Sequence, residues 1–220
     1  MAWSYTYDDM NRVLTADASA GPDAGMDLSW AYDRYGNRWS QTATGSGGGG
    51  ATQPSLTFNG DTNRADGYSY DAAGNLLNDG LNQYAYDGAN RILSINNQAT
   101  GYVYDAEGNR VAKLSSGGAL ETIYILTSGN RQLTELNGSG GWNHTNIYAP
   151  GGRLLATYDS STQPSPGYHY NLTDWLGTKR MQTTASGNSQ ETCTSNPYGD
   201  GLNCTGGADA TEQHFTGKEN

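Results

Sequence analysis

Apolar and aromatic residues occur along this chain in short alternating runs, which clusters of Gly, Asn and Asp separate from one another. Successive side chains of a strand point to opposite faces of a sheet, so residues i and i+2 share a face. Runs such as Tyr102-Val-Tyr104 therefore place two rings on the same side. No stretch of ten residues repeats its apolar positions with the helical period. The pattern predicts short strands joined by tight turns, and so an all-β protein.

One phrase recurs along the chain: an aromatic residue, any residue, Tyr, Asp, a short turn, then Asn with Arg or Leu, and an apolar strand. Three loose copies lie around Tyr124, Tyr148 and Tyr168-His-Tyr170. In the core of the array the second tyrosine recurs about every twenty residues, which indicates similar structural units in series. The Tyr-Asp pairs of the five close copies are Tyr7-Asp8, Tyr32-Asp33, Tyr70-Asp71, Tyr86-Asp87 and Tyr104-Asp105.

Each copy has the chemistry of a β-hairpin. Its Asp can accept hydrogen bonds from backbone amides ahead of it, and a glycine such as Gly108 can take the positive φ of a hairpin bulge. A single hairpin is only marginally stable, so neighbouring hairpins must pair. The sequence therefore predicts hairpins stacked into a continuous coiling β-sheet, whose stability is a sum over neighbouring repeats.

Two long spacings mark insertions within this array. One lies between Tyr7 and Tyr32. The other, between Tyr32 and Tyr70, contains Gly45-Ser-Gly-Gly-Gly-Gly50, which is flexible by composition. Because the same repeat continues on both sides of this loop, we do not interpret it as a domain linker and expect a single domain.

The composition makes the tyrosines the main source of buried surface. Leu, Ile, Val and Phe number only 27 of 220 residues, a proportion typical of disordered chains. Sixteen tyrosines and five tryptophans supply the missing apolar area. We therefore expect most tyrosines to be buried on the packed face of the sheet. The alternative is a periodic stripe of exposed rings that stacks on sugars.

Several classes of function are disfavoured. The net charge of −10, with only 12 Lys and Arg, argues against binding a phosphate backbone, so no nucleic-acid partner is expected. No run of 18 apolar residues would span a membrane, and the first twenty residues do not resemble a signal peptide. His144, His169 and His214 are scattered, and no Gly-x-Ser-x-Gly or His-Glu-x-x-His motif occurs. We expect no enzymatic activity, no catalytic site and no cofactor.

The repeated aspartates allow a second interpretation, because recurring acidic turns bind Ca²⁺ in some β-rolls. Further oxygen ligands are sparse here, and the richest copy is Asp105-Ala-Glu107-Gly-Asn109. We favour turn capping over a metal site for these residues.

Cys193 and Cys204 lie close together in an otherwise cysteine-free chain. A local disulfide is the simplest interpretation and implies an oxidising destination, while two free thiols are the alternative. A zinc site that adds His169 or His214 is disfavoured, because no CxxC or HxxxH spacing is present.

Tyr-Asp followed by Gly-Asn-Arg resembles the YD repeat of the RHS-repeat family, the large secreted proteins of bacterial polymorphic toxins, with animal teneurins as relatives. The resemblance implies a β-spiral that winds into a hollow shell around a C-terminal toxin, in an extracellular or cell-surface bacterial protein. The C-terminal quarter is similar to the RHS-repeat-associated core. The matching segments are Tyr168-His-Tyr170, Asp174-Trp-Leu-Gly-Thr-Lys-Arg180, Gly187-Asn188, Asn196-Pro-Tyr-Gly-Asp200 and Phe215-Thr-Gly-Lys-Glu219.

The resemblance also divides the chain. Residues 1–158 are expected to form the YD-repeat spiral, and residues 159–220 a core-like segment continuous with the same sheet. Family members cleave themselves at an Asp-Pro motif beyond the Phe-Thr-Gly-Lys-Glu segment. None of the six prolines here follows an Asp, so we expect neither the cleavage motif nor the toxin within these residues.

Two functions of different class follow. The first is a structural, non-catalytic shell module, whose partners are the rest of a longer shell or further copies that pair end to end. In that case we expect the strand near Tyr5–Tyr7 to pair with C-terminal strands, unless loops and the tail cover both edges. The second is an extracellular binding module, in which the tyrosines or acidic turns bind glycan or Ca²⁺.

Overall fold

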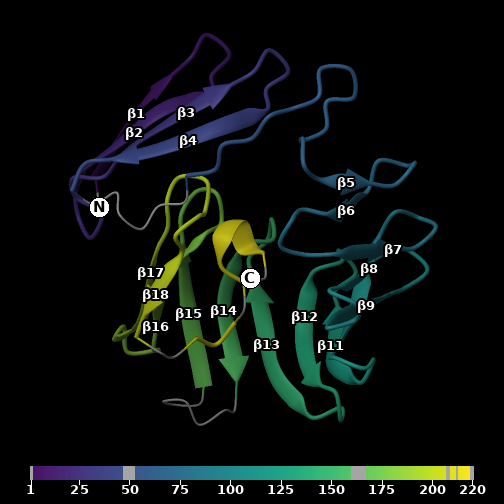
Figure 1. Cartoon of the computed structure of the whole chain (residues 1–220). Coiled ribbons are helices and arrows are strands. Elements are labelled where there is room, and N and C mark those ends of the chain that lie inside the picture. Colours follow the sequence, from purple (N-terminus) through teal and green to yellow (C-terminus); the bar gives the residue numbers. More distant parts are fainter. Residues whose placement is uncertain (1, 47–52, 160–166, 207–208, 212, 219–220) are drawn as a thin grey trace. The chain divides into compact units, whose positions relative to one another are not determined.

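A computed structural model of the chain describes residues 2–46, 53–159, 167–206, 209–211 and 213–218 (Figure 1). Its regular elements are β-strands, apart from one 3₁₀ turn, η2, at Phe215–Gly217. The all-β fold predicted from the alternating pattern is therefore confirmed. Most of the predicted glycine loop, residues 47–50, lies outside the described residues. In the described ranges, no helix has the length and apolar character needed to cross a membrane.

The chain forms two compact units. The first contains Met1–Asp66 and Thr194–Asn203, and the second contains Gly67–Cys193 and Cys204–Asn220. The chain therefore enters the first unit twice. The expected boundary at residue 158 remains a prediction about family segments. It falls inside β14 (Leu154–Asp159), which pairs with β15 in one sheet.

The first unit is built on a four-stranded antiparallel sheet in the order β1–β2–β3–β4. Its strands are β1 (Ala2–Tyr7), β2 (Val13–Ala20), β3 (Asp27–Tyr32) and β4 (Arg38–Thr44). Alternation in β2 and β3 buries Ala16, Ala18, Leu28 and Trp30 on one face. The returning segment Thr194–Asn203 packs here, with the Tyr198 ring centroid 5.3 Å from that of Trp30.

The second unit contains a two-stranded hairpin and a twelve-stranded antiparallel sheet. In the large sheet each strand pairs with the one before it and the one after it, without a crossover. The sheet therefore grows hairpin by hairpin, as the repeat predicts. The hairpin strands are β5 (Ser69–Tyr70) and β6 (Leu76–Asn78). The large sheet comprises β7 (Tyr84–Tyr86), β8 (Ile92–Ile95), β9 (Thr100–Tyr104), β10 (Arg110–Leu114), β11 (Leu120–Leu126), β12 (Gln132–Asn137), β13 (Trp142–Tyr148), β14 (Leu154–Asp159), β15 (Gly167–Thr173), β16 (Lys179–Thr183), β17 (Ser189–Thr194) and β18 (Asn203–Thr205).

The strand registers define two unlike faces over β11–β17. One row pairs Glu135 with His144 and His144 with Asp159, and all three side chains are buried. We call this the polar face. Its buried residues are Glu135, His144, Asn146, Thr157, Asp159, His169, Asn171, Gln182 and Glu191.

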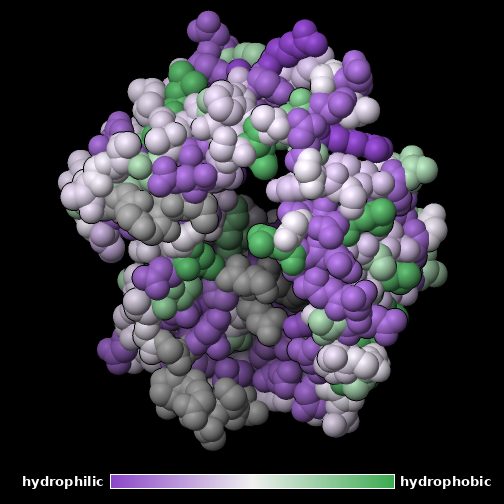
Figure 2. Space-filling view, viewed as in Figure 1, coloured by the Kyte–Doolittle hydropathy of each residue, from purple (hydrophilic) through white to green (hydrophobic). Residues whose placement is uncertain are grey.

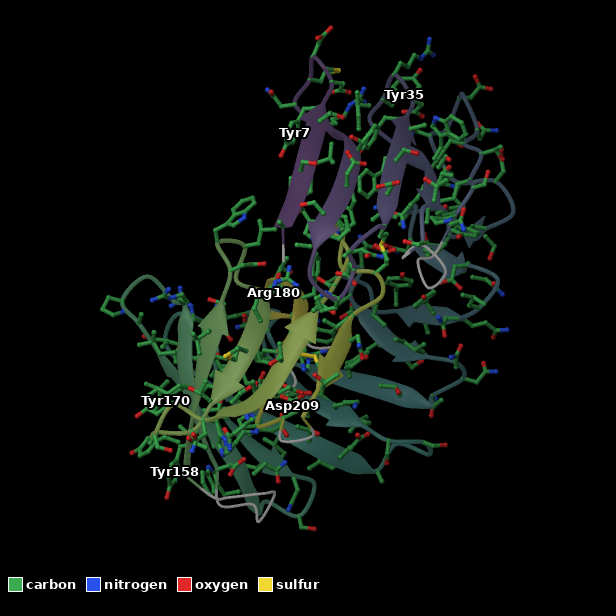
Figure 3. All side chains as sticks on the ribbon, turned by 90° about the vertical axis from the view of Figure 1, so that its left-hand side faces the viewer. Tyr7, Tyr35, Tyr158, Tyr170, Arg180 and Asp209 are labelled. Atoms are coloured by element: carbon green, nitrogen blue, oxygen red, sulfur yellow. A yellow bond between two sulfur atoms is a disulfide. The ribbon has the colours of Figure 1, made fainter. Side chains whose placement is uncertain are left out.

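The opposite face is apolar and exposed. There the register aligns Ile125, Thr134, Thr145, Tyr158 and Tyr168 in one row. We call this the aromatic face, and in Figure 3 two of its members, Tyr158 and Tyr170, lie apart from Asp209. Its exposed large residues are Ile125, Trp142, Ile147, Tyr158, Tyr168, Tyr170 and Leu172.

A C-terminal segment explains why the polar face is the buried one. We call residues 209–211 and 213–218 the strap. The backbone N–H of Ala210 donates to Oε1 of Gln182 at 3.1 Å, and Nε2 of Gln213 donates to Oε1 of Gln132 at 3.3 Å. Buried polar groups need such partners, because an unpaired one costs about 1–3 kcal/mol.

In the view of Figure 2 hydrophilic residues predominate on the surface, with hydrophobic ones scattered among them.

Candidate functional site

One five-residue turn recurs at least thirteen times in the described residues. The backbone N–H of its first residue donates to the carbonyl oxygen of the fifth residue. The carbonyl oxygen of the first residue accepts the backbone N–H of the fourth residue. In the turn that begins at Asp105 these distances are 3.0 Å to Asn109 and 3.1 Å to Gly108. The fourth residue has positive φ, 87° at Gly108 and 61° at Asn90, which defines a type I turn followed by a left-handed bulge. The first residues are Asp8, Asp33, Asp71, Asp87, Asp105, Ser115, Thr127, Asn137, Ala149, Asp174, Thr184, Asn196 and His214.

The aspartates of the five close copies cap this turn with both carboxylate oxygens. Oδ1 of Asp105 accepts the backbone N–H of Asn109 at 2.8 Å, and Oδ2 accepts its side-chain Nδ2 at 3.0 Å. In the turn of Asp87 the fifth residue is Arg91, whose backbone N–H and Nε donate in the same two ways. Asn and Arg can therefore alternate at this position, because each supplies a side-chain donor to the Asp.

These hydrogen bonds favour the ionised carboxylate. The side-chain and backbone donors of Asn109 lower the pKa of Asp105, and the pKa values of Asp8, Asp33, Asp71 and Asp87 are also lowered. A cation at Asp105 would have to displace donors from both of its oxygens.

In several repeats the fifth residue also connects its turn to the next repeat. The guanidinium of Arg12 lies 4.7 Å from the ring centroid of Tyr32, and its Nη1 donates to the carbonyl oxygen of Asp33 at 3.1 Å. The hydroxyl of Tyr32 returns a hydrogen bond to the carbonyl oxygen of Val13 at 2.8 Å. The second tyrosine of a repeat is thus held by the arginine of the repeat before it.

The same connection occurs elsewhere in the array. Arg91 lies 4.7 Å from the ring of Tyr104, whose hydroxyl donates to the carbonyl oxygen of Ile92 at 2.8 Å. Where Asn replaces Arg, Nδ2 of Asn75 donates to Oδ1 of Asn90 in the following turn at 2.8 Å. We call this series of capped and connected turns the turn ladder.

The ladder corrects one expectation about the tyrosines. Of the sixteen tyrosines only Tyr124 is buried, whereas seven are exposed and the rest are half-buried. The expectation of a mainly tyrosine core was wrong. The rings under arginines keep one side open, and rings such as Tyr158 and Tyr168 lie on the aromatic face.

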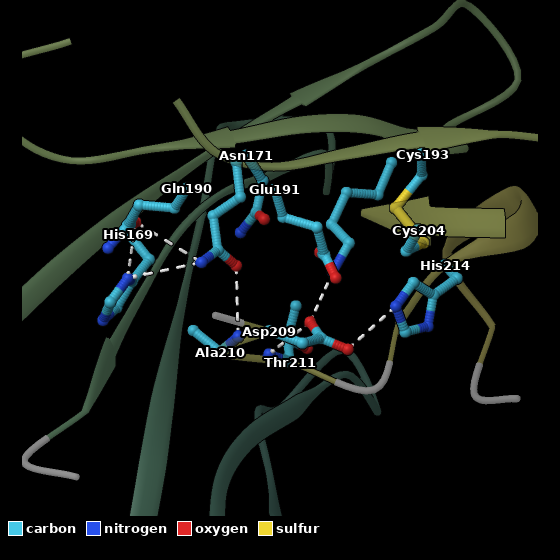
Figure 4. A network of polar contacts seen from close by, with 12 residues as sticks. His169, Asn171, Gln190, Glu191, Cys193, Cys204, Asp209, Ala210, Thr211 and His214 are labelled. Carbon is cyan, nitrogen blue, oxygen red and sulfur yellow. Dashed lines mark hydrogen bonds and ion pairs between the residues drawn. A yellow bond between two sulfur atoms is a disulfide. The ribbon is translucent and has the colours of Figure 1, made fainter. Parts of the chain in front are cut away.

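The strap is held to the polar face by charges as well as by amides (Figure 4). Lys179 is only 1% exposed, and its Nζ lies 2.6 Å from Oε2 of Glu191 and in contact with Oδ1 of Asp209. Oδ2 of Asp209 lies 2.9 Å from Nε2 of His214. Partial burial acts to raise the pKa of Asp209, but hydrogen bonds from His214 and Lys179 outweigh it and lower the pKa to about 2.

The histidine on the far side of the polar face is held in a similar way. His169 is 1% exposed, its Nδ1 lies 2.8 Å from Oε1 of Gln190, and its Nε2 lies 3.3 Å from Oδ1 of Asp159. These contacts occupy both ring nitrogens inside the sheet. The geometry suits a structural role for His169.

Cys193 and Cys204 are joined in a disulfide. The two cysteines belong to the second unit, and the residues between them are the segment that packs in the first unit. The bridge therefore closes the base of that loop. Sequence reasoning identified the pair but not the destination of the loop, since Tyr198 and Trp30 lie far apart in the chain.

A cavity of about 660 Å³ opens in the second unit between several turns and the strap. Its lining includes Arg110, Arg131, Arg153 and Lys218, although the whole chain is acidic. Arg131, Arg153 and Lys218 are each the fifth residue of one of the recurring turns. The cavity could not be predicted from the sequence, because the strap and the turns meet only in the folded sheet.

Capped hairpins that add strand by strand to one sheet define a YD-repeat shell wall. A sequence model of the teneurin YD-shell family matches residues 1–206, and the chain belongs to that family. A search of curated proteins gave no match.

The fold is also similar to solved Tc toxin structures. The crystal structure of TcdB2-TccC3 is 14% identical, with a TM-score of 0.69, and that of TcdB2-TccC3-TEV is 14% identical, with a TM-score of 0.70. The Tc holotoxin pore of Photorhabdus luminescens, with a mutated TccC3, is 15% identical with a TM-score of 0.69. Each match covers 99% of this chain and 13% of the other, so this chain spans a small part of those proteins.

The ladder predicts that backbone conformation matters more than charge at its turns. Gly108→Val should lower the free energy of unfolding by about 1 kcal/mol or more, because φ is 87° there. Strain is the cause, since a Cβ at Gly108 would meet its nearest atom, Nη1 of Arg91, at 3.4 Å. Gly88→Val is the control, because a Cβ there meets nothing within 4 Å. Urea unfolding followed by circular dichroism measures both, and equal losses would contradict the prediction.

A second prediction concerns acid. The five capping aspartates have lowered pKa values in the folded state, against about 3.9 when unfolded. Their stabilisation is therefore complete above pH 4–5 and is lost as the pH falls through the folded values. The melting temperature should fall steeply below about pH 4. The Asp105→Asn variant should have a slightly lower melting temperature at pH 7, because Asn caps the turn less well than Asp. Between pH 5 and 3 its melting temperature should fall less than that of the wild type. A flat wild-type profile over that range would contradict this assignment.

Proposed function

We propose that this chain is a non-catalytic wall segment of a secreted RHS-type shell, which in longer members of the family encloses a C-terminal toxin. The main support is the uninterrupted order β7 to β18, in which each hairpin adds to the edge left by the previous one. A wall of any length can be built in this way. Connections between neighbouring turns provide stability from repeat to repeat.

We assign the polar face to the interior of the shell. The strap lies against this face, so a chain that continues from the strap begins on that side. The polar face is lined by hydrogen-bonding side chains. Thr157 donates to Asn146 within the sheet, and Gln182 accepts the backbone N–H of Ala210 from the strap. The aromatic face is then on the outside.

The proposal includes pairing through strand edges. In the described parts of the chain, β1 and β18 each have a strand partner on one side only. The free N–H and C=O groups of such an edge recruit further strands. These edges can pair with flanking strands of a longer shell, or with further copies of this chain. Unlike ends that pair head to tail do not close by default, so copies would form filaments or tubes.

Light scattering at rising protein concentration tests edge pairing. The wild type should gain mass beyond one chain of 23.4 kDa, and more so in salt, which screens the repulsion between acidic chains. Tyr7→Lys places a charge on the β1 edge and should reduce association. Tyr35→Lys is the matched control, because Tyr7 and Tyr35 are 56% and 55% exposed and only Tyr7 lies on the edge strand (Figure 3). A constant mass of one chain at millimolar protein would exclude self-assembly.

A second candidate function rests on the aromatic face. Rings of Trp142, Tyr158, Tyr168 and Tyr170 lie in series, with centroids 4.9–6.5 Å apart, and their exposed fractions are 37–51%. Exposed rings of this kind can stack on sugars. The acidic turns are the corresponding candidates for Ca²⁺.

A glycan array and a calcium titration of the melting temperature separate the two functions. The wall-segment proposal expects no saturable response in either. If a glycan binds, Tyr168→Ala should abolish binding and Tyr35→Ala should not. Calcium stabilisation that Asp105→Asn removes would favour the acidic-turn alternative.

A further inference from the structure

Four potential metal ligands converge where the strap meets the end of the large sheet. Glu191 and Cys193 lie on β17, Cys204 lies on β18, and His214 comes from the strap. One ligand atom from each lies within 4.8 Å of all the others. Glu191, Cys193 and His214 are buried, and Cys204 is half-buried. Figure 4 shows the disulfide between Glu191 and His214.

We propose that these four side chains bind one Zn²⁺ ion when the disulfide is reduced. Two thiolates, an imidazole and a carboxylate form a tetrahedral donor set that zinc accepts. With the bond lengths zinc prefers, ligand atoms lie about 3.3–3.8 Å apart. The ligand atoms of Glu191 and His214 therefore need to move closer to the others by about 1.5 Å at most, and the two sulfurs, which are bonded to each other in the disulfide, need to move apart.

The conversion balances in atoms and electrons. A dithiol reductant supplies two electrons and two protons, the Sγ–Sγ bond of Cys193 and Cys204 breaks, and the reductant becomes a disulfide. The two thiols then release two protons as their sulfurs bond to Zn²⁺. Oxidation reverses these steps and expels the ion.

The surrounding charges suit both states equally. A disulfide is neutral, and two thiolates with one Zn²⁺ also sum to zero. Lys179 already lies 2.6 Å from Glu191 and compensates its charge in either state. Without a metal the two reduced sulfurs stay protonated, because two thiolates would add two negative charges beside Glu191 and Asp209. A divalent cation compensates those charges and allows both protons to leave.

His214 is positioned for this role by its neighbour. A carboxylate beside a metal-binding histidine commonly orients the ring and raises its basicity. Asp209 lies 2.9 Å from the ring of His214 and is itself held by Lys179. Soft sulfur ligands favour Zn²⁺ over Ca²⁺ or Mg²⁺. In a reducing compartment, where the disulfide is lost, the zinc site would keep β17 joined to β18 and would also attach the strap through His214.

Metal binding by the full chain, without an affinity tag, tests the proposal. After treatment with a phosphine reductant and dialysis against zinc, the protein should retain one equivalent of zinc. The oxidised protein should retain none. Cobalt in place of zinc should give the intense visible bands of a tetrahedral site and a thiolate charge-transfer band in the near ultraviolet. Reduced protein should melt higher with zinc than with a chelator.

Matched variants locate the site. His214→Gln and Glu191→Gln should each weaken zinc binding at least about tenfold. Removing a group that only supports a metal ligand already has an effect of that size, and these two residues are proposed as ligands themselves. His169→Gln and Glu135→Gln, which change buried residues of the same polar face, should leave zinc binding unchanged. Circular dichroism verifies that each variant is folded.

Three results would overturn the proposal: less than half an equivalent of zinc in reduced wild type, equal retention by oxidised protein, or a cobalt spectrum without thiolate bands. The wild-type measurements are decisive even if a variant fails to fold. They are also independent of shell function, since edge pairing and glycan binding have separate readouts.

Discussion

The structure depends on one interaction, the capture of the fifth residue of a turn by the aspartate that begins it. Asp87 binds both the backbone and the side chain of Arg91, and the same arginine then lies over Tyr104 of the following repeat. The same arginine thus closes one turn and connects that turn to the following repeat. Because charged hydrogen bonds and cation–π contacts of this kind recur along the array, their contributions to stability add from repeat to repeat.

This arrangement allows a sheet with few aliphatic residues to fold. Buried charges are costly unless they are paired and hydrogen-bonded, and the polar face meets both conditions where Lys179 lies between Glu191 and Asp209. The strap therefore contributes to the stability of the sheet. The first unit solves the same problem differently, with a small apolar cluster around Leu28 and Trp30.

The repeat identified the turns and strands from sequence because both depend on neighbouring residues. Gly108 was expected to have positive φ for local steric reasons, and φ is 87°. Which face would be buried could not be predicted, since alternation gives two faces and only the distant strap selects one. The contact of Gln213 with Gln132 spans 81 residues, and that of Gln41 with Asp200 spans 159. Such pairings leave no periodic trace in the sequence.

In the turn ladder, the length of the strands is independent of the connections between neighbouring turns. β7 has three residues and β2 has eight. The same capped turn nevertheless follows β7, where it begins at Asp87, and precedes β2, where it begins at Asp8. Residues inserted between two turns lengthen a strand without altering how one turn meets the next. Insertion and deletion can therefore lengthen or shorten the strands of such a sheet locally, while the connections between neighbouring turns stay the same.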